Sequence, residues 1–401
     1  MIAPVPTIAA PALAALLASE RIGPRDGVGK TCVVAMSGGV DSAVTALVMR
    51  ERGYHVIGIN LRLFSPDDAD HRANPCCGIP AMDDARMTCA RIGIPFYAIN
   101  MEGEFREAVV QRFVDEYAAG RTPNPCLECN RHVKFRHLVE RARMIGADCL
   151  ATGHYARVER GATEREPHRL LRAVDPKKDQ SYVLYTLTQE QLGFIHFPLG
   201  GLHKTETRAL ARAFDLQVAE KAESQEICFV GKRSYANFVA ERRPDVTRPG
   251  EIVDTDGEAL GEHRGLVHHT VGQRRGLGIA AAEPLFVIRL EPAHNRLVVG
   301  PREAAAAREI ALERVSVTSG LWPEGPFAAE AMVRYRGALT PAMVEPGPVA
   351  SAAARVRFSG DGPIASPGQA LVLYRGDEVL GGGTIGDVRR SDPPSNTRHD
   401  S

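Results

Sequence analysis

Short apolar runs alternate with helix-forming stretches in the first half of the chain. The apolar runs predict buried strands at residues 31–36, 55–61, 95–100 and 149–158. The stretches between them predict helices at residues 42–52, 82–92, 104–119 and 132–145. Such alternation is typical of a parallel sheet with right-handed crossovers, whose ligands bind at the carboxyl ends of the strands. We therefore expect an α/β fold for this half.

The second half shows a different pattern. A polar, loop-rich region is expected from residues 189–191, followed by a helix at 204–214. From Gly250 onward, Gly, Pro and Asp separate short β-like runs at 250–253, 284–290, 296–299, 329–335, 353–358 and 370–374. Their spacing predicts a small central domain and then a C-terminal β-barrel. The expected division is a flexible tail (1–27), an ATP-binding catalytic domain (28–232), the central domain (233–303), the barrel (304–388) and a disordered tail (389–401).

Charge and cysteine content narrow the class of protein. Among 401 residues, Lys plus Arg equals Asp plus Glu at 49 each, so any nucleic-acid surface must be a local patch. Eight cysteines occur without a basic, signal-like N-terminus, which favours reduced thiols in the cytoplasm. The first basic residue is Arg21, and a short helix is expected at residues 13–19. No apolar stretch is long enough to span a membrane.

A glycine-rich loop follows the first predicted strand, in the sequence Ser37-Gly38-Gly39-Val40-Asp41-Ser42. Glycines let backbone amides approach an anion closely, and the helix that follows adds partial positive charge. The Gly-Lys-Ser/Thr ending of phosphoryl-transfer loops is absent. The motif instead resembles the pyrophosphate loop of enzymes that split ATP into AMP and pyrophosphate.

Two further segments contain cysteines that could take part in catalysis. Cys129 ends the run Thr122-Pro-Asn-Pro-Cys-Leu-Glu-Cys and opens a predicted helix, and basic residues follow it. A thiol near a helix N-terminus and basic groups favours its thiolate, which suits a nucleophile. Cys228 lies in Ser224-Gln-Glu-Ile-Cys-Phe-Val.

Several interpretations compete for the thiols. Cys126 and Cys129 could form half of a zinc site with Cys76 and Cys77, although adjacent cysteines suit tetrahedral binding poorly. An iron–sulfur cluster on the same thiols is left open by the sequence, and we do not predict one. Buried, unreactive cysteine is the interpretation for Cys32, Cys89 and Cys149, which lie in apolar runs.

Five motifs in this order resemble tRNA-specific 2-thiouridylases: SGGVDS, TPNPxxxCN, ATGHYA, KKDQSYVLY and SQEICFVGK. The resemblance extends from about residue 31 to about residue 383. It implies a pyrophosphate-loop domain, a small central domain and a C-terminal β-barrel. It also implies ATP-dependent replacement of the C2 oxygen of the wobble uridine of tRNA by sulfur, with Mg²⁺, a persulfide sulfur donor and a monomeric enzyme.

The resemblance also assigns residues. Cys129 would be the nucleophile and Cys228 the carrier of the persulfide. The implied ATP site is Ala35, Met36, Ser37, Gly38, Gly39, Val40, Asp41, Ser42, Leu61 and Gly153. The implied tRNA contacts are Asn124, Pro125, Cys126, His154, Lys178, Asp179, Gln180, Arg334, Tyr335 and Gln369. Alternating arginines at 334/336 and 355/357 would place two cations on one face of each strand.

The chain departs from the family pattern at one position, and two other functions are compatible with its motifs. Many family members have aspartate three residues before the nucleophile, where this chain has Cys126, so a carboxylate acid–base role there cannot operate. The alternative enzyme is another pyrophosphate-loop ligase, of the tRNA lysidine synthetase or amidotransferase type, which would not need the cysteines. The alternative outside catalysis is a tRNA-binding protein that retains the fold.

Overall fold

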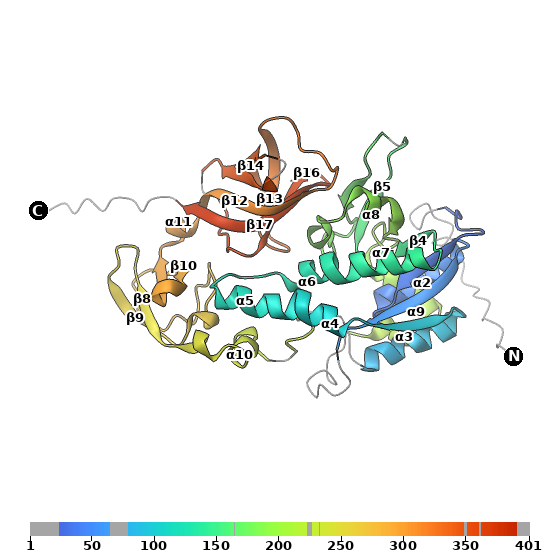
Figure 1. Cartoon of the computed structure of the whole chain (residues 1–401), viewed down its shortest axis with the longest axis horizontal. Coiled ribbons are helices and arrows are strands. Elements are labelled where there is room, and N and C mark those ends of the chain that lie inside the picture. The colour runs from blue at the N-terminus through green and yellow to red at the C-terminus, as the bar shows by residue number, and fades with distance from the viewer. Residues whose placement is uncertain are drawn as a thin grey trace, which may run out of the picture.

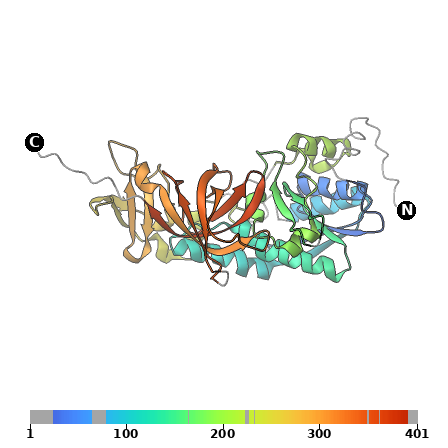
Figure 2. The ribbon, with the colours of Figure 1, turned by 90° about the horizontal axis from the view of Figure 1, so that it is seen from above.

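A computed structural model describes residues 24–64, 79–163, 165–222, 227–231, 233–348, 351–360 and 362–390. An α/β domain lies at one end of an elongated molecule, and the barrel and the small central domain lie toward the other end (Figures 1 and 2). The helices around α5 run beneath the barrel (Figure 1). Within the described ranges, no helix is long and apolar enough to cross a membrane. The predicted helix at 13–19 and Cys76 and Cys77 lie outside these ranges.

The α/β domain is built on a five-stranded parallel sheet of order β3-β2-β1-β4-β7. The strands are β1 (Thr31–Ala35), β2 (His55–Arg62), β3 (Phe96–Asn100), β4 (Cys149–Ala151) and β7 (Ile195–His196). The chain adds β2 and β3 on one side of β1 and then β4 on the other. The strand order therefore reverses at β1, and ligands of such sheets bind in the crevice at this point.

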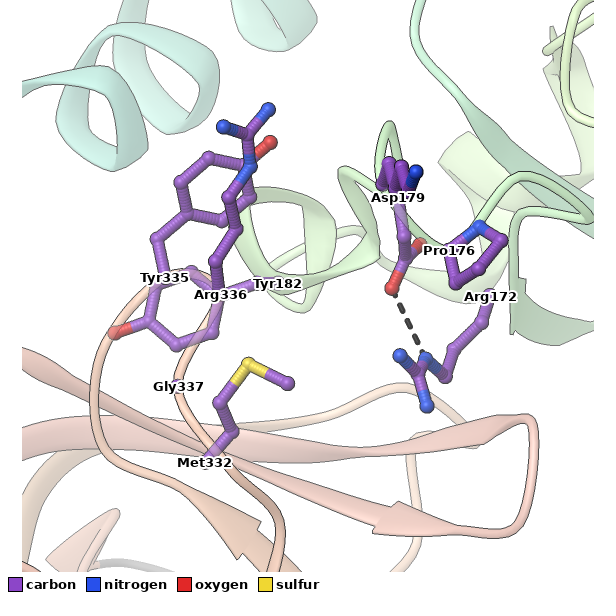
Figure 3. A pocket seen from close by; sticks show the side chains of 9 residues that line it. Arg172, Pro176, Asp179, Tyr182, Met332, Tyr335, Arg336 and Gly337 are labelled. Atoms are coloured by element: carbon purple, nitrogen blue, oxygen red, sulfur yellow. Dashed lines mark hydrogen bonds and ion pairs between the residues drawn. The ribbon is translucent and has the colours of Figure 1, made fainter. Parts of the chain in front are cut away.

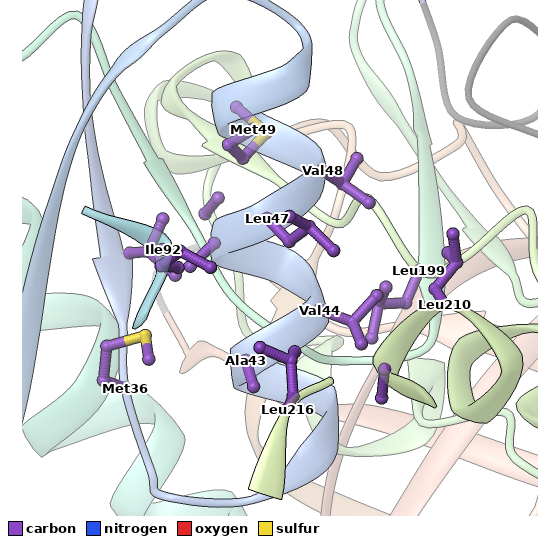
Figure 4. Close-up of a cluster of buried hydrophobic side chains, with 14 of the residues drawn as sticks. Met36, Ala43, Val44, Leu47, Val48, Met49, Ile92, Leu199, Leu210 and Leu216 are labelled. Atoms are coloured by element: carbon purple, nitrogen blue, oxygen red, sulfur yellow. The ribbon is translucent and has the colours of Figure 1, made fainter. Parts of the chain in front are cut away.

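Helices cover both faces of this sheet. They are α2 (Val40–Glu51), α3 (Ile79–Ile92), α7 (Phe135–Met144), α8 (Gln189–Phe194) and α9 (Lys204–Ala213). Val44 and Leu47 of α2 pack in one apolar cluster with Leu210 of α9 (Figure 4). Leu138 of α7 packs on the other face with Val33. The loop-rich region predicted from residue 189 was wrong, because α8 begins there with a capping box of Thr188 and Gln191.

A second helical layer leads toward the cysteines. It comprises α4 (Glu102–Phe105), a π-helical segment (Arg106–Gln111), α5 (Arg112–Ala118), α6 (Pro125–Glu128) and a second π-helical segment (Cys129–Lys134). The predicted helix at 104–119 is confirmed as one continuous run of α- and π-helical turns.

The central domain holds a four-stranded sheet of order β10-β11-β8-β9. Its elements are α10 (Tyr235–Ala240), β8 (Gly250–Val253), β9 (Ala259–His263), β10 (Phe286–Glu291), β11 (Arg296–Gly300) and α11 (Arg302–Ala305). The predicted runs at 250–253, 284–290 and 296–299 correspond to β8, β10 and β11.

Six strands close the C-terminal barrel in the order β12-β15-β14-β13-β16-β17, with β17 pairing back to β12. They are β12 (Ala307–Val317), β13 (Phe327–Met332), β14 (Thr340–Pro346), β15 (Ala354–Phe358), β16 (Ala370–Arg375) and β17 (Glu378–Arg390). The predicted α/β fold with a C-terminal barrel is thus confirmed. The last strand reaches two residues into the segment expected to be a disordered tail.

One predicted strand belongs to two different sheets. The run 149–158 divides into β4 of the parallel sheet and β5 (Ala156–Glu159), so its prediction as one strand was wrong. With β6 (Arg169–Arg172), β5 forms a hairpin that pairs through Leu170 and Leu171 with β17 of the barrel. The α/β domain and the barrel are therefore joined by continuous backbone hydrogen bonding.

Candidate active site

The glycine-rich loop connects β1 to α2 at the carboxyl edge of the parallel sheet. Gly38 has a φ of +72°, and a Cβ there would clash with the carbonyl of Ala81. Gly39 occupies the N-cap position of α2 in an extended conformation. Because only glycine combines this backbone conformation with this close approach, the first turn of α2 is open to an anion.

Two serines hold the loop in shape. The Ser42 hydroxyl accepts a hydrogen bond from the Ser37 amide at 3.1 Å and donates to the Gly39 carbonyl at 3.0 Å. The two hydroxyl oxygens also lie 3.2 Å apart. The loop therefore has a fixed geometry before any ligand binds, which lowers the entropic cost of binding.

Gly153 brings the loop after β4 against the glycine-rich loop. A Cβ on Gly153 would lie 2.9 Å from the Asp41 carbonyl carbon and 3.0 Å from the Ser42 amide nitrogen. The two loops meet where the strand order reverses. The Gly153 backbone thus packs directly against the glycine-rich loop.

Two lysines at this loop could not be recognised from the motif. Lys204, the first residue of α9, contacts both Asp41 carboxylate oxygens at 2.6 and 2.8 Å. Lys221 donates to the Gly38 carbonyl at 2.9 Å and to Asp84 at 2.6 Å. Tyr155 of the predicted Ala-Thr-Gly-His-Tyr motif also donates to Asp41, at 3.0 Å. Both lysines are paired with carboxylates, so they bring hydrogen-bond donors to the loop without adding net positive charge.

The strand β2 links the loop to the cysteines. Met36 donates its amide to the Ile59 carbonyl, and Asn60 donates its side-chain amide to the Met36 carbonyl at 2.6 Å. Ile59 is the last residue of β2 that pairs with β1, and Leu61 lies two residues beyond it. Leu61 is partly buried. It packs against the apolar cluster on the α7 side of the sheet and against the next apolar cluster.

That next cluster contains both candidate catalytic cysteines. Cys129 is buried and Cys228 is half-buried, and both pack in one apolar cluster with Phe105, Phe113 and Phe229. The Phe229 ring meets the Phe105 and Phe113 rings edge to face, with centroids 5.8 and 5.0 Å apart. The structure therefore places two cysteines from distant parts of the chain in the same apolar cluster.

The local helix around Cys129 differs from the prediction. The helix begins at Pro125, and Asn124 caps it by accepting a hydrogen bond from the Leu127 amide at 3.2 Å. Cys129 therefore lies one turn inside the helix and starts its π-helical segment, so the prediction that it opens the helix was wrong. Cys126, exposed in the first turn, holds that position instead. A π-helical turn widens the helix and is frequent at functional sites.

A metal centre on these thiols finds no support in the described residues. In the part of the chain that the structure describes, no three His, Cys, Asp or Glu side chains are grouped to hold a metal ion. Cys76 and Cys77, the proposed second half of a zinc site, lie outside that part. Cys32, Cys89 and Cys149 are buried, as predicted.

Three family models cover most of the chain in the order of its domains. A tRNA methyl transferase HUP domain matches residues 30–232, a tRNA methyl transferase PRC-barrel domain matches 236–301, and an aminomethyltransferase β-barrel domain matches 307–385. The tRNA-specific 2-thiouridylase of Roseiflexus sp. (strain RS-1) is 46% identical and covers 88% of this chain and 98% of its own. The enzyme of Methylorubrum extorquens is 49% identical and covers 88% of this chain and 92% of its own. The enzyme of Geobacter metallireducens is 48% identical and covers 89% of this chain and 96% of its own.

The chain belongs to the tRNA-specific 2-thiouridylase family.

The 2-thiouridylase motif Lys178-Asp179-Gln180 has largely structural contacts here. Asp179 is buried and accepts hydrogen bonds from Arg172, the Ala173 amide and the Ser181 amide and hydroxyl. Gln180 accepts from the Tyr155 amide at 2.9 Å. Lys178 is half-buried. Asp179 and Gln180 thus fix the segment that would present Lys178 to tRNA.

A pocket of about 340 Å³ lies between this segment and the barrel (Figure 3). Its charged and aromatic lining residues are Arg172, Lys177, Asp179, Tyr182, Tyr335 and Arg336. Burial raises the pKa of Tyr335. The charge and the hydrogen bond of Arg336 lower this pKa in part, whereas Asp179 and, to a smaller extent, Cys126 raise it further.

The prediction that alternating arginines share a strand face is confirmed for residues 355 and 357 and wrong for residues 334 and 336. β13 ends at Met332, so exposed Arg334 and Arg336 lie in the turn that follows and not on a strand face. Arg355 and Arg357 do share the exposed face of β15. However, Arg357 pairs with both Glu309 at 2.7 Å and Glu345 at 2.5 Å, which already neutralise its charge.

His154 and Gln369 occupy different surroundings. The His154 ring packs beside Phe135 and Phe197, and its Nδ1 lies 2.8 Å from the Thr152 hydroxyl. Burial and then the charge of Lys134 lower the pKa of His154 to about 3, so the ring is neutral at physiological pH. Gln369 is half-buried in the turn before β16, where its carbonyl accepts the Ile385 amide at 2.7 Å.

Proposed function

We propose that this protein is a tRNA-uridine 2-sulfurtransferase that thiolates C2 of the wobble uridine of tRNA, using ATP. The observation that carries the proposal is the shared cluster of Cys129 and Cys228 beside a preformed pyrophosphate-type loop. The family models describe methyl transfer, whereas the relatives are named for thiolation. A loop suited to ATP and two cysteines in one apolar cluster suit the second chemistry.

ATP would bind as a substrate at the glycine-rich loop. Gly38, Gly39 and the first turn of α2 would bind the phosphates, and Leu61 and Gly153 would border the nucleotide. Mg²⁺ binds nucleotides through phosphate oxygens and one or two carboxylates, and Asp41 is the carboxylate of this loop. When bound, Mg²⁺ would neutralise negative charge on the departing pyrophosphate.

The reaction first makes the C2 oxygen a leaving group. The uracil O2 attacks the α-phosphorus, an O–P bond forms and pyrophosphate leaves. Lys204 and Lys221 lie where they would stabilise the charge that develops on pyrophosphate. The base has to leave the anticodon stack to reach this site, since its C2 atom is otherwise covered. Asn124, Pro125 and Cys126 would line its pocket.

The sulfur then arrives as a persulfide on Cys228, supplied by a cysteine desulfurase or a sulfur-relay protein. The terminal sulfur attacks C2 and AMP leaves. The Cys129 thiolate then attacks the Cys228 sulfur, which releases 2-thiouridine and leaves a Cys129–Cys228 disulfide. Equivalently, Cys129 attacks the persulfide first and releases hydrosulfide, which attacks C2. Either route oxidises two thiols, so a dithiol reductant must restore them in each turnover.

The test is nucleoside mass spectrometry of unmodified tRNA after incubation with the protein, Mg-ATP, a cysteine desulfurase, cysteine and a reductant. We expect one 2-thiouridine and one AMP per turnover. Cys129→Ser and Cys228→Ser should each abolish thiolation, whereas Cys89→Ser, which changes a buried cysteine outside the site, should keep it. Normal thiolation by Cys129→Ser would refute the proposal and favour a ligase that does not use sulfur. The proposal includes a monomeric enzyme, as the family resemblance implies, that acts in the cytoplasm.

A further inference from the structure

The barrel strand β12 carries an irregularity that faces the catalytic segment. Its pairing with β17 shifts between Glu313 and Ser316, and Arg314 within this shift has a φ of +50°. Non-glycine residues rarely adopt this left-handed conformation, and bulges that enforce it serve to redirect a side chain. The local backbone is thus strained in a way that determines where the Arg314 side chain goes.

The Arg314 guanidinium reaches from the barrel to the residue before Cys129. Its Nη2 lies 3.0 Å from Glu128 Oε1 and donates to the Thr384 hydroxyl at 2.8 Å, and its Nη1 lies 3.4 Å from Glu128 Oε2. Glu128 is only 4% exposed, and it immediately precedes the candidate nucleophile. A two-pronged contact of this kind fixes orientation as well as distance.

Glu128 is held from two other elements as well. His132 Nε2 lies 3.2 Å and Arg112 Nε lies 3.7 Å from Glu128 Oε2. Burial alone would raise the pKa of Glu128. Hydrogen bonds from His132 and Arg314 and the charges of Arg314 and Arg112 outweigh burial and lower it to about 2. The carboxylate is therefore ionised at neutral pH, and a buried charge is costly once it loses a partner.

The barrel also holds the other end of the same segment. The Thr122 amide donates to the Pro367 carbonyl at 2.7 Å, and a Cβ on Gly368 would lie 2.9 Å from the Thr122 nitrogen. The segment 122–128, which leads into Cys129, is thus fixed at both ends by barrel residues.

We propose that Arg314 is a positioning residue, through which the C-terminal barrel holds Glu128 and thereby the Cys129 thiol in its reactive place. The proposal rests on the proposed function, because it takes Cys129 as the reacting thiol. Arg314 acts through Glu128 and does not touch the substrate. The barrel then does more than bind tRNA: it completes the site that carries out the sulfur transfer.

The kinetic test is a double-mutant cycle on single-turnover thiolation. Arg314→Met should slow the step about 10-fold or more, with the tRNA Kd changed by less than about 3-fold. Arg314→Lys keeps the positive charge but loses the two-pronged contact with Glu128, so it should recover only part of the rate. Arg314→Met/Glu128→Gln should be no slower than Arg314→Met, because the two residues act as one unit. Additive losses, or a Kd effect that accounts for the whole loss, would overturn the proposal.

A matched control uses another ion pair between the same two domains. Arg157 of β5 contacts Asp377 of the barrel at 2.7 Å, away from the cysteine segment. Asp377→Asn should leave the single-turnover rate within about 2-fold of the parent. A loss as large as that of Arg314→Met would show that any weakening of the domain contact slows the enzyme, against a specific role.

A second readout does not depend on activity. Cys129 is 7% exposed and Cys32 is fully buried, so iodoacetamide labelling of each can be followed by peptide mass spectrometry. In Arg314→Met, labelling of Cys129 should become several-fold faster while Cys32 stays protected. Unchanged Cys129 labelling, or equal acceleration at Cys32 through global loosening, would refute positioning by Arg314. If Cys129→Ser retained thiolation, the proposed function would fail while this labelling result still stood.

Discussion

The glycine-rich loop and the cysteine site are supported in contrasting ways. The loop keeps its own shape, because Ser37, Gly39 and Ser42 form hydrogen bonds among themselves. The cysteine site depends on other domains and segments, since Cys228 comes from far along the chain and Arg314 from the barrel. The first site can therefore exist in the α/β domain by itself, whereas the second is completed only when the barrel is docked. ATP binding and sulfur transfer should respond to different mutations.

The largest effect should come from the loop. Gly38→Ala places a side chain at a φ of +72° and against the Ala81 carbonyl, so the loop must move. We expect AMP formation to fall by at least about 100-fold, on the order of 3 kcal/mol in the barrier. The measurement is AMP release in a single turnover with tRNA and Mg-ATP.

Gly278→Ala is the matched control for this change. Gly278 has a similar φ of +73°, but nothing lies within 4 Å of an added Cβ. Gly278→Ala introduces the same type of conformational strain, which costs about 1 kcal/mol, but no clash. It should therefore leave AMP formation nearly normal. Comparable losses in the two variants would mean that the Gly38 effect is loss of stability and not loss of loop geometry.

An intermediate effect should appear in the pH dependence of stability at the cysteine site. The pKa of Glu128 is lowered from 4.5 to about 2, so its ion pairs contribute about 3 kcal/mol to the free energy of unfolding above pH 4.5. That contribution is lost as the pH falls from 4.5 toward 2. Glu128→Gln should therefore lower the urea midpoint at pH 5, and the gap between the two proteins should narrow by pH 3.5. A gap that is equal at pH 5 and 3.5 would contradict the ionised carboxylate.

The same contrast explains what could be predicted from the sequence. The loop was recognisable because its conformation depends on adjacent glycines and serines, and the order of strands and helices around it follows from local periodicity. Lys204 and Arg314 gave no such signal, because each meets its partner across a large separation in sequence. Their roles depend on the packing of whole domains.

Local patterns also misled at particular positions. The sequence predicted that Cys129 opens a helix, but Pro125 takes the first helical position and Asn124 caps the helix. β17, which contains Gly381–383, was not among the predicted strands. A Cβ on Gly382 would clash with the Leu371 carbonyl, so close packing of barrel strands requires glycine there. In both cases the tertiary contacts determine a conformation that composition alone does not.

The smallest effect distinguishes arginines on the barrel that look alike in sequence. Arg336 lies in the exposed turn at the pocket, with its guanidinium 5.1 Å from the centre of the Tyr335 ring, whereas Arg357 is bound by two carboxylates. A free cation releases counterions when it meets a phosphate, but a cation already neutralised by its neighbours adds little. Arg336→Met should weaken tRNA binding a few-fold and reduce the slope of log K against log salt by about 0.7, while Arg357→Met leaves the slope unchanged. Equal slopes for the two variants would show that Arg336 does not neutralise a tRNA phosphate.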